Sequence, residues 1–266
     1  MGPAQVKADW AAVLLLLAPG AAQARVDAQD LAQLSFRQHP GAQLPLNAEV
    51  RDDAGRPVSL ASEFDSKPTV FVLEYLRCQN LCSLVLSGAT NALSSAHLVP
   101  GRDFSLVAVS IDPRDTAQDA AASRAMYSRR FANPRAAAAG IHFLTGSPDE
   151  VSKIAGVVGF PYRFDRATNQ FAHPAGFVVA TPSGRISRYM LGLNPDPATL
   201  REALAEAGQG TVEPPAHPLL LLCFGYDPDE GTVAALAMRL VRWVSLAVLL
   251  GSALLIGFLS MRRRNA

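Results

Sequence analysis

The 266-residue sequence has almost no net charge, because 24 lysine and arginine residues stand against 23 aspartate and glutamate residues. It also lacks a basic stripe with interleaved aromatic residues, the usual mark of a nucleic-acid surface. No internal repeat emerges, and the length suits one sizeable domain with accessory segments. The composition therefore excludes nucleic acid as the expected partner. Cysteine and histidine are scarce, with three and five residues, so candidates for a metal or redox site are few.

The first of two terminal apolar segments resembles a secretory signal. Lys7 precedes an apolar run over residues 10–18, and Ala22-Gln23-Ala24 follows it. A charged start, a short apolar stretch and an A-x-A site predict a signal peptide over residues 1–24. The run is too short to span a bilayer, which needs about 20 apolar residues. An uncleaved amphipathic start is the alternative.

The second apolar segment, residues 243–261, contains no charged residue and is followed by Arg262, Arg263 and Arg264. It predicts a transmembrane helix over residues 241–261 and a cytoplasmic tail over residues 262–266. A buried core helix would need a partner layer that the remaining residues cannot supply. Export and a C-terminal anchor together place the preceding domain in the periplasm or an equivalent extracytoplasmic space.

Between these segments, residues 25–210 predict one α/β domain, and residues 211–240 predict a linker and juxtamembrane segment. Buried strands are expected at 68–76, 104–111 and 141–144, helices at 80–95, 115–131, 147–158 and 197–207, and a hairpin at 176–180 and 185–191. This order predicts a mostly parallel central sheet closed by an antiparallel hairpin, with helices on both faces.

Cys78 and Cys82 follow the first buried strand, where the next helix begins. Sites form at the carboxyl ends of strands in open α/β sheets, and a helix N-terminus favours thiolate over thiol. A spacing of four residues places both sulfurs on one helical face, where they can bridge or share a soft metal. A structural disulfide is the alternative, although closing so short a loop adds little stability.

His173 is the histidine best placed to complete a metal site. It closes a predicted loop over residues 162–172, and that loop would lie over the cysteine-bearing helix terminus. Two thiolates and an imidazole suit Cu(I) and tolerate Cu(II), whereas zinc would need a fourth ligand. Asp112 ends the strand at 104–111 and either orients the site through a hydrogen bond or caps the turn before Pro113.

Several motifs together resemble the Sco/SenC family. They are the C-x-x-x-C pair, the run Ser110-Ile111-Asp112-Pro113, the run Ala172-His173-Pro174, and the stretches 159–192 and 223–231. The resemblance spans residues 40–260 and implies a thioredoxin-like fold with copper bound by Cys78, Cys82 and His173. Gln79 stands where the family usually has proline, which bears on redox poise.

The resemblance further implies a role in assembling the dinuclear copper centre of cytochrome c oxidase. The implied partner is the copper-accepting subunit of that oxidase, with other periplasmic copper chaperones and thiol reductants as further candidates. In this interpretation the chain is a copper metallochaperone, and Cys78 and Cys82 also form a redox-active pair able to reduce the acceptor cysteines.

The main alternative is a membrane-anchored thiol–disulfide oxidoreductase without a metal role. His173 discriminates between the two functions, because dithiol exchange needs no imidazole ligand. The C-x₃-C spacing and the absence of a preceding tryptophan argue against a general oxidoreductase, and a peroxidase ranks last. In a thioredoxin-like fold, Pro174 would also occupy a position where a cis proline faces the cysteine pair.

Overall fold

The computed structural model describes residues 34–77, 82–166 and 168–214, together with residues 243–246, 248 and 251–252; for Cys82 and Ser83 it describes the backbone alone. The described strands are β1 (Glu49–Arg51), β2 (Pro57–Ser59), β3 (Thr69–Glu74), β4 (Ser105–Ser110), β5 (Ile141–Gly146), β6 (Arg163–Asp165), β7 (Gln170–Ala172), β8 (Gly176–Ala180) and β9 (Ile186–Leu191). The described helices are the 3₁₀ turn η1 (Leu60–Glu63) and α3 (Cys82–Ser95), α4 (Ala117–Ser128), α5 (Pro134–Ala138), α6 (Pro148–Val158) and α7 (Pro197–Gly208).

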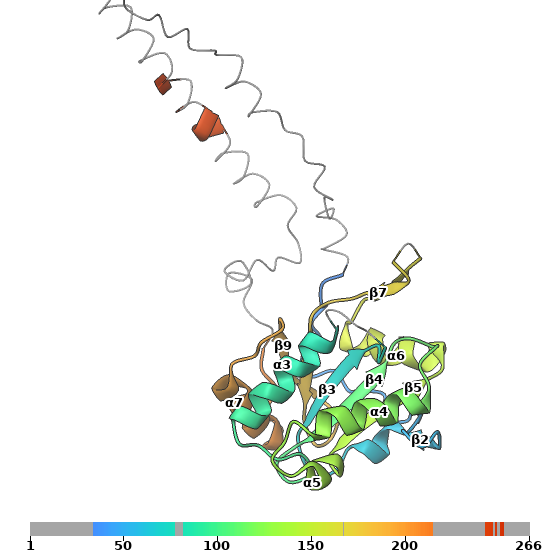
Figure 1. Ribbon diagram of the computed structural model, residues 1–266. Coiled ribbons are helices and arrows are strands. Elements are labelled where there is room, and N and C mark those ends of the chain that lie inside the picture. The colour runs from blue at the N-terminus through green and yellow to red at the C-terminus, as the bar shows by residue number, and fades with distance from the viewer. Residues whose placement is uncertain are drawn as a thin grey trace, which may run out of the picture.

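A seven-stranded sheet in the order β2-β1-β5-β4-β3-β8-β9 forms the centre of the domain (Figure 1). Its three central strands, β3, β4 and β5, are parallel, and the hairpin β8–β9 joins β3 in antiparallel orientation. The parallel centre and the closing hairpin confirm the prediction from sequence. On the other edge, β1 and β2 add an antiparallel pair that was not predicted.

Both faces of the sheet are covered, because alternate side chains of the central strands point to opposite sides. Val70 and Val72 of β3 pack with α3, α4, α5 and α7, which lie on one face. Phe71 and Leu73 pack on the other face with α6, η1 and the chain before β1. Figure 1 shows α3 and α4 in front of the strands. The predicted helices on both faces are therefore confirmed.

Local signals define the ends of the helices near the site. Thr116 and Asp119 form a capping box that begins α4. Ser147 caps α6, and Pro148 occupies its first turn. Gly159 ends α6 in the left-handed conformation, with φ 64°, and a Cβ there would lie 1.8 Å from the carbonyl oxygen of Arg37. This glycine turns the chain from α6 back toward the carboxyl edge of the sheet.

The segments predicted to target and anchor the protein fall mostly outside the described residues. These are the signal peptide (1–24), all but four residues of the linker (211–240), most of the membrane helix (241–261) and the tail (262–266). Residues 243–246, 248 and 251–252 are helical, and Ser252 Oγ donates to the carbonyl oxygen of Val248 at 2.7 Å. Within the described part of the chain, no helix is both long and apolar enough to span a membrane.

Candidate metal centre

His173 lies directly after β7, and its imidazole is held between two aromatic rings. Its ring stacks on Phe160, with centroids 5.3 Å apart and an interplanar angle of 27°. It meets the ring of Tyr75 edge-on at 6.0 Å. Tyr75 is the residue after β3, and Phe160 follows α6. The tertiary fold therefore brings His173 against the segment that leads into Cys78.

The environment of His173 favours the neutral imidazole. Burial lowers the pKa of His173, and the hydrogen bond between Nδ1 and the carbonyl oxygen of Pro174, at 2.9 Å, opposes that change only in part. A lowered pKa keeps the ring neutral over more of the pH range, and the neutral ring is the form that binds metals. When Nδ1 carries the proton for this bond, Nε2 is the ring nitrogen that bears the lone pair for a metal.

The two cysteines are the part of the predicted site that the structure does not reach. Cys78 lies outside the described residues, and Cys82 is described only by its backbone, at the first residue of α3. Among the described side chains, no three histidine, cysteine, aspartate or glutamate residues are grouped so as to hold a metal ion. The assignment of Cys78, Cys82 and His173 to one site stays a prediction.

A cavity of about 650 Å³ lies beside His173. Tyr75, Val85 of the first turn of α3, and Leu193 contribute to its walls, together with residues of β7. The half-buried imidazole therefore borders a space between the end of β3, which precedes Cys78, and the beginning of α3, whose first residue is Cys82.

The other described histidines have different surroundings. His142 lies on β5, two strands away from β3, and its Nδ1 lies 2.6 Å from Glu63 Oε2. His39 Nδ1 lies 3.1 Å from the carbonyl oxygen of Val157. His97 follows α3 with a positive φ of 55°. His217 lies outside the described residues. Of the histidines that these contacts describe, His173 is the one packed against Tyr75.

Asp112 is buried at the end of β4 and is bound by Arg114. Its carboxylate accepts bonds from the Arg114 backbone N–H at 2.9 Å, from Nε at 2.8 Å and from Nη2 at 2.7 Å. Burial acts to raise the pKa of Asp112, but these hydrogen bonds outweigh it and the pKa lies below its ordinary value. Asp112 thus caps the turn after β4 and anchors Arg114.

The residues that sequence reasoning missed are Arg114, Asp115 and Asn169. Residues 162–172, predicted as a loop, contain the hairpin β6–β7, which projects from the domain (Figure 1). Arg114 Nη1 donates to Asn169 Oδ1, near the tip of this hairpin, at 2.7 Å. For Arg114 and Asp115, the sequence signal that could have identified them is the alternation of acidic and basic residues in Asp112-Pro113-Arg114-Asp115, after a buried strand.

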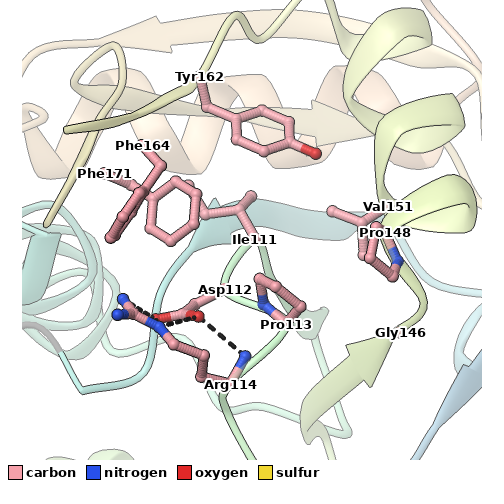
Figure 2. A pocket seen from close by; sticks show the side chains of 10 residues that line it. All are labelled: Ile111, Asp112, Pro113, Arg114, Gly146, Pro148, Val151, Tyr162, Phe164 and Phe171. Carbon is pink, nitrogen blue, oxygen red and sulfur yellow. Dashed lines mark hydrogen bonds and ion pairs between the residues drawn. The ribbon is translucent and has the colours of Figure 1, made fainter. Parts of the chain in front are cut away.

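A second cavity, of about 490 Å³, lies on the other side of the hairpin and is mostly apolar (Figure 2). Figure 2 shows the Arg114 guanidinium bound to Asp112 near the rings of Phe164 and Phe171. Its Cζ lies 4.9 Å from the Phe164 centroid and 5.9 Å from the Phe171 centroid. Phe171 of β7 lines both cavities.

The expectation of a cis proline is wrong. Among the described residues no peptide bond is cis, so the bond between His173 and Pro174 is trans. An X–Pro bond prefers trans by about 0.5–1 kcal/mol unless the tertiary structure compensates. At Pro174 the tertiary structure does not overcome this preference for the trans bond.

Comparisons with known proteins place the chain in a family. The model of the SCO1/SenC family matches residues 49–209, and no curated protein matches the chain significantly in sequence. A crystal structure of a proposed electron transfer protein from Aquifex aeolicus is similar to it, with 22% identity, a TM-score of 0.56, and coverage of 65% of this chain and 96% of that one. A SCO1/SenC family lipoprotein from Bacillus anthracis matches with 15% identity, a TM-score of 0.51, and coverage of 65% and 99%.

A copper-bound ScoI structure from Arabidopsis thaliana is also similar, with 21% identity, a TM-score of 0.49, and coverage of 65% of this chain and 98% of that one. The family match covers more than half of the chain and includes the end of β3, the β4–α4 connection and the residues around His173. The fold is thioredoxin-like, as the sequence motifs implied, and the chain belongs to the SCO1/SenC family.

Proposed function

We propose that this protein is a copper carrier for the assembly of the copper centre of cytochrome c oxidase. In this proposal Cys78, Cys82 and His173 hold the metal. The observation that carries it is the placement of His173, whose neutral imidazole is fixed against Tyr75, three residues before Cys78. A dithiol exchange site has no need of such a ligand.

The donor set fits copper. Two thiolates and an imidazole are soft to borderline ligands, which suit Cu(I) and tolerate Cu(II). Cys82 is the first described residue of α3, and the positive end of a helix dipole stabilises a thiolate. The half-buried position of His173 beside a cavity leaves a route by which the metal can leave. That suits a carrier, which must release its cargo.

Carrier activity is tested by copper transfer between purified proteins. The full chain, purified in detergent and loaded with Cu(I), is mixed with the reduced, metal-free copper-accepting subunit of the oxidase. We expect copper to elute with the acceptor after separation, and the Cys223→Ser variant to transfer as much as the wild type. A parallel mixture contains the acceptor in its disulfide form. If that acceptor becomes reduced while copper stays with the chain in the first mixture, the protein is an oxidoreductase and the carrier proposal is wrong.

We also propose that residues 241–261 anchor the protein in a membrane, with residues 25–210 in the periplasm or an equivalent space. Large apolar side chains support this, because Trp243, Val244, Leu246 and Val248 are all more than 45% exposed on the described helical residues. The arginines at 262–264 favour a cytoplasmic end. A reporter that works only in the cytoplasm should be active when fused after Ala266, and activity of an exported reporter there would contradict this orientation.

A further inference from the structure

The connection after β4 contacts the two chain segments that carry the proposed copper ligands. This connection, residues 111–116, is called the β4–α4 loop. Two adjacent residues of it, Arg114 and Asp115, point to different partners. One partner leads to the cysteine pair and the other leads to His173.

Asp115 holds the segment that leads to the cysteines. Its side chain is fully buried, and its carboxylate accepts bonds from the backbone N–H of Leu76 at 2.7 Å, from Arg77 Nε at 2.9 Å and from Ser110 Oγ at 2.6 Å. Leu76 and Arg77 are the last described residues before Cys78. Hydrogen bonds to an ionised carboxylate are about twice as strong as neutral ones. The chain is therefore fixed up to the residue before Cys78.

Arg114 holds the hairpin that leads to His173. Its guanidinium donates to Asn169 Oδ1 and lies over Phe164 and Phe171, on both strands of the hairpin. Phe171 in turn packs against Tyr75, with ring centroids 5.8 Å apart. The buried Asp112 binds Arg114 through both the backbone and the guanidinium, so the arginine is itself held in place. β7 ends at Ala172, one residue before His173.

We propose that the β4–α4 loop sets the separation between the cysteine segment and His173, with Asp115 and Arg114 as positioning residues for the copper ligands. This inference rests on the proposed function, because it assumes that the cysteines and His173 share one metal. Ligand distances tolerate changes of only about 0.2 Å, so movement of either segment weakens the site. Arg114 acts through His173, whereas Asp115 acts through Cys78.

The test is a double-mutant cycle on the full chain in detergent, in which Cu(I) affinity is measured by competition with a Cu(I) chelator. Arg114→Ala should lower the affinity about 10-fold, the lower end of the loss seen when a group bonded directly to a metal ligand is removed, because Arg114 acts on His173 only through the hairpin. In a His173→Ala background it should cause no further loss, because the residue through which it acts is absent. Arg102→Ala removes another arginine paired with an aspartate, in a distant turn, and should leave the affinity unchanged.

A milder variant covers the case in which Arg114→Ala fails to fold. Asn169 is exposed and has a positive φ of 56°, which glycine adopts without strain. Asn169→Gly therefore removes the hydrogen bond to Arg114 alone. It should lower the affinity about 2- to 10-fold, the range of one hydrogen bond, and again only when His173 is present.

The cysteine segment has its own measurement. Asp115→Asn weakens the bonds to Leu76 and Arg77, so the segment before Cys78 is held less firmly for a bridge. It also leaves Arg77 with Asp119 Oδ2, 3.9 Å away, as its remaining carboxylate partner, so more of the Arg77 charge can stabilise thiolates. Both effects favour the dithiol, so the equilibrium against glutathione should shift toward it by about tenfold, or about 30 mV. Asn169→Gly should leave that equilibrium unchanged.

The outcomes separate the two ideas. If His173→Ala leaves Cu(I) affinity unchanged, the proposed copper site fails. If His173→Ala weakens binding but Arg114→Ala and Asn169→Gly do not, the copper site stands and the positioning role of Arg114 is wrong. A loss from Arg114→Ala that persists in the His173→Ala background means general loosening of the domain, which also overturns the inference. If the dithiol–disulfide equilibrium is unchanged in Asp115→Asn, the positioning role of Asp115 is wrong.

Discussion

Oxidation of Cys78 and Cys82 to a disulfide is expected to abolish the uptake of Cu(I) by this protein. The thiolate is the metal ligand, and a disulfide sulfur is no longer a thiolate. His173 would then remain as a single imidazole, which cannot hold Cu(I) against a competing chelator. Binding and bridging are therefore mutually exclusive, and copper loading should depend on the redox state of the pair.

The measurement is a titration of the oxidised and reduced full chain with Cu(I) under anaerobic conditions. It is best made in the Cys223→Ser variant, so that the pair supplies the only thiols. Reduced protein should bind copper with a clear stoichiometric end point, and oxidised protein should bind none. In the reverse direction, bound copper should protect both cysteines from alkylation. Equal uptake by the two forms would show that the cysteine pair is not the copper site.

His173→Ala should lower Cu(I) affinity by more than about 100-fold. Loss of an outer-shell partner alone typically costs about 10- to 100-fold in metal affinity, and this substitution removes a ligand. We expect no compensation by His142, because it lies on β5, two strands away from β3, and pairs with Glu63. The equilibrium between dithiol and disulfide should change far less, since the imidazole takes no part in it.

Competition with a Cu(I) chelator gives the affinity, and exchange with glutathione gives the thiol equilibrium. His39→Ala is a suitable control because His39 is exposed and its Nδ1 contacts only a backbone carbonyl among its described partners. The control should bind copper as the wild type does. A plain oxidoreductase would show the opposite pattern, with His173→Ala unchanged in copper affinity.

The fold was predictable wherever a segment carried a long apolar run, a helical spacing of apolar residues, or clear capping residues. The buried strands β3 and β4 are continuous apolar runs, and α6 has both a serine cap and a proline in its first turn. The strands β1, β2, β6 and β7 have three residues each, too few for an alternating pattern to show. The helix α5, with the sequence PRAAA, was missed because it has little more than one turn and no apolar periodicity. These elements exist because tertiary pairing and packing select them.

The sequence alone determined the order of the central elements and the position of the cysteine pair after the first buried strand, and it predicted His173 as the third metal ligand. Each of these predictions rests on neighbouring residues: apolar runs, helix caps, and the short motifs that contain the cysteines and His173. Only the tertiary structure decided how His173 is held between Phe160 and Tyr75, and that Arg114 and Asp115 reach the two segments flanking the site. Those contacts join residues 13 to 98 positions apart. No local pattern encodes such contacts, because they depend on how the strands align in the sheet.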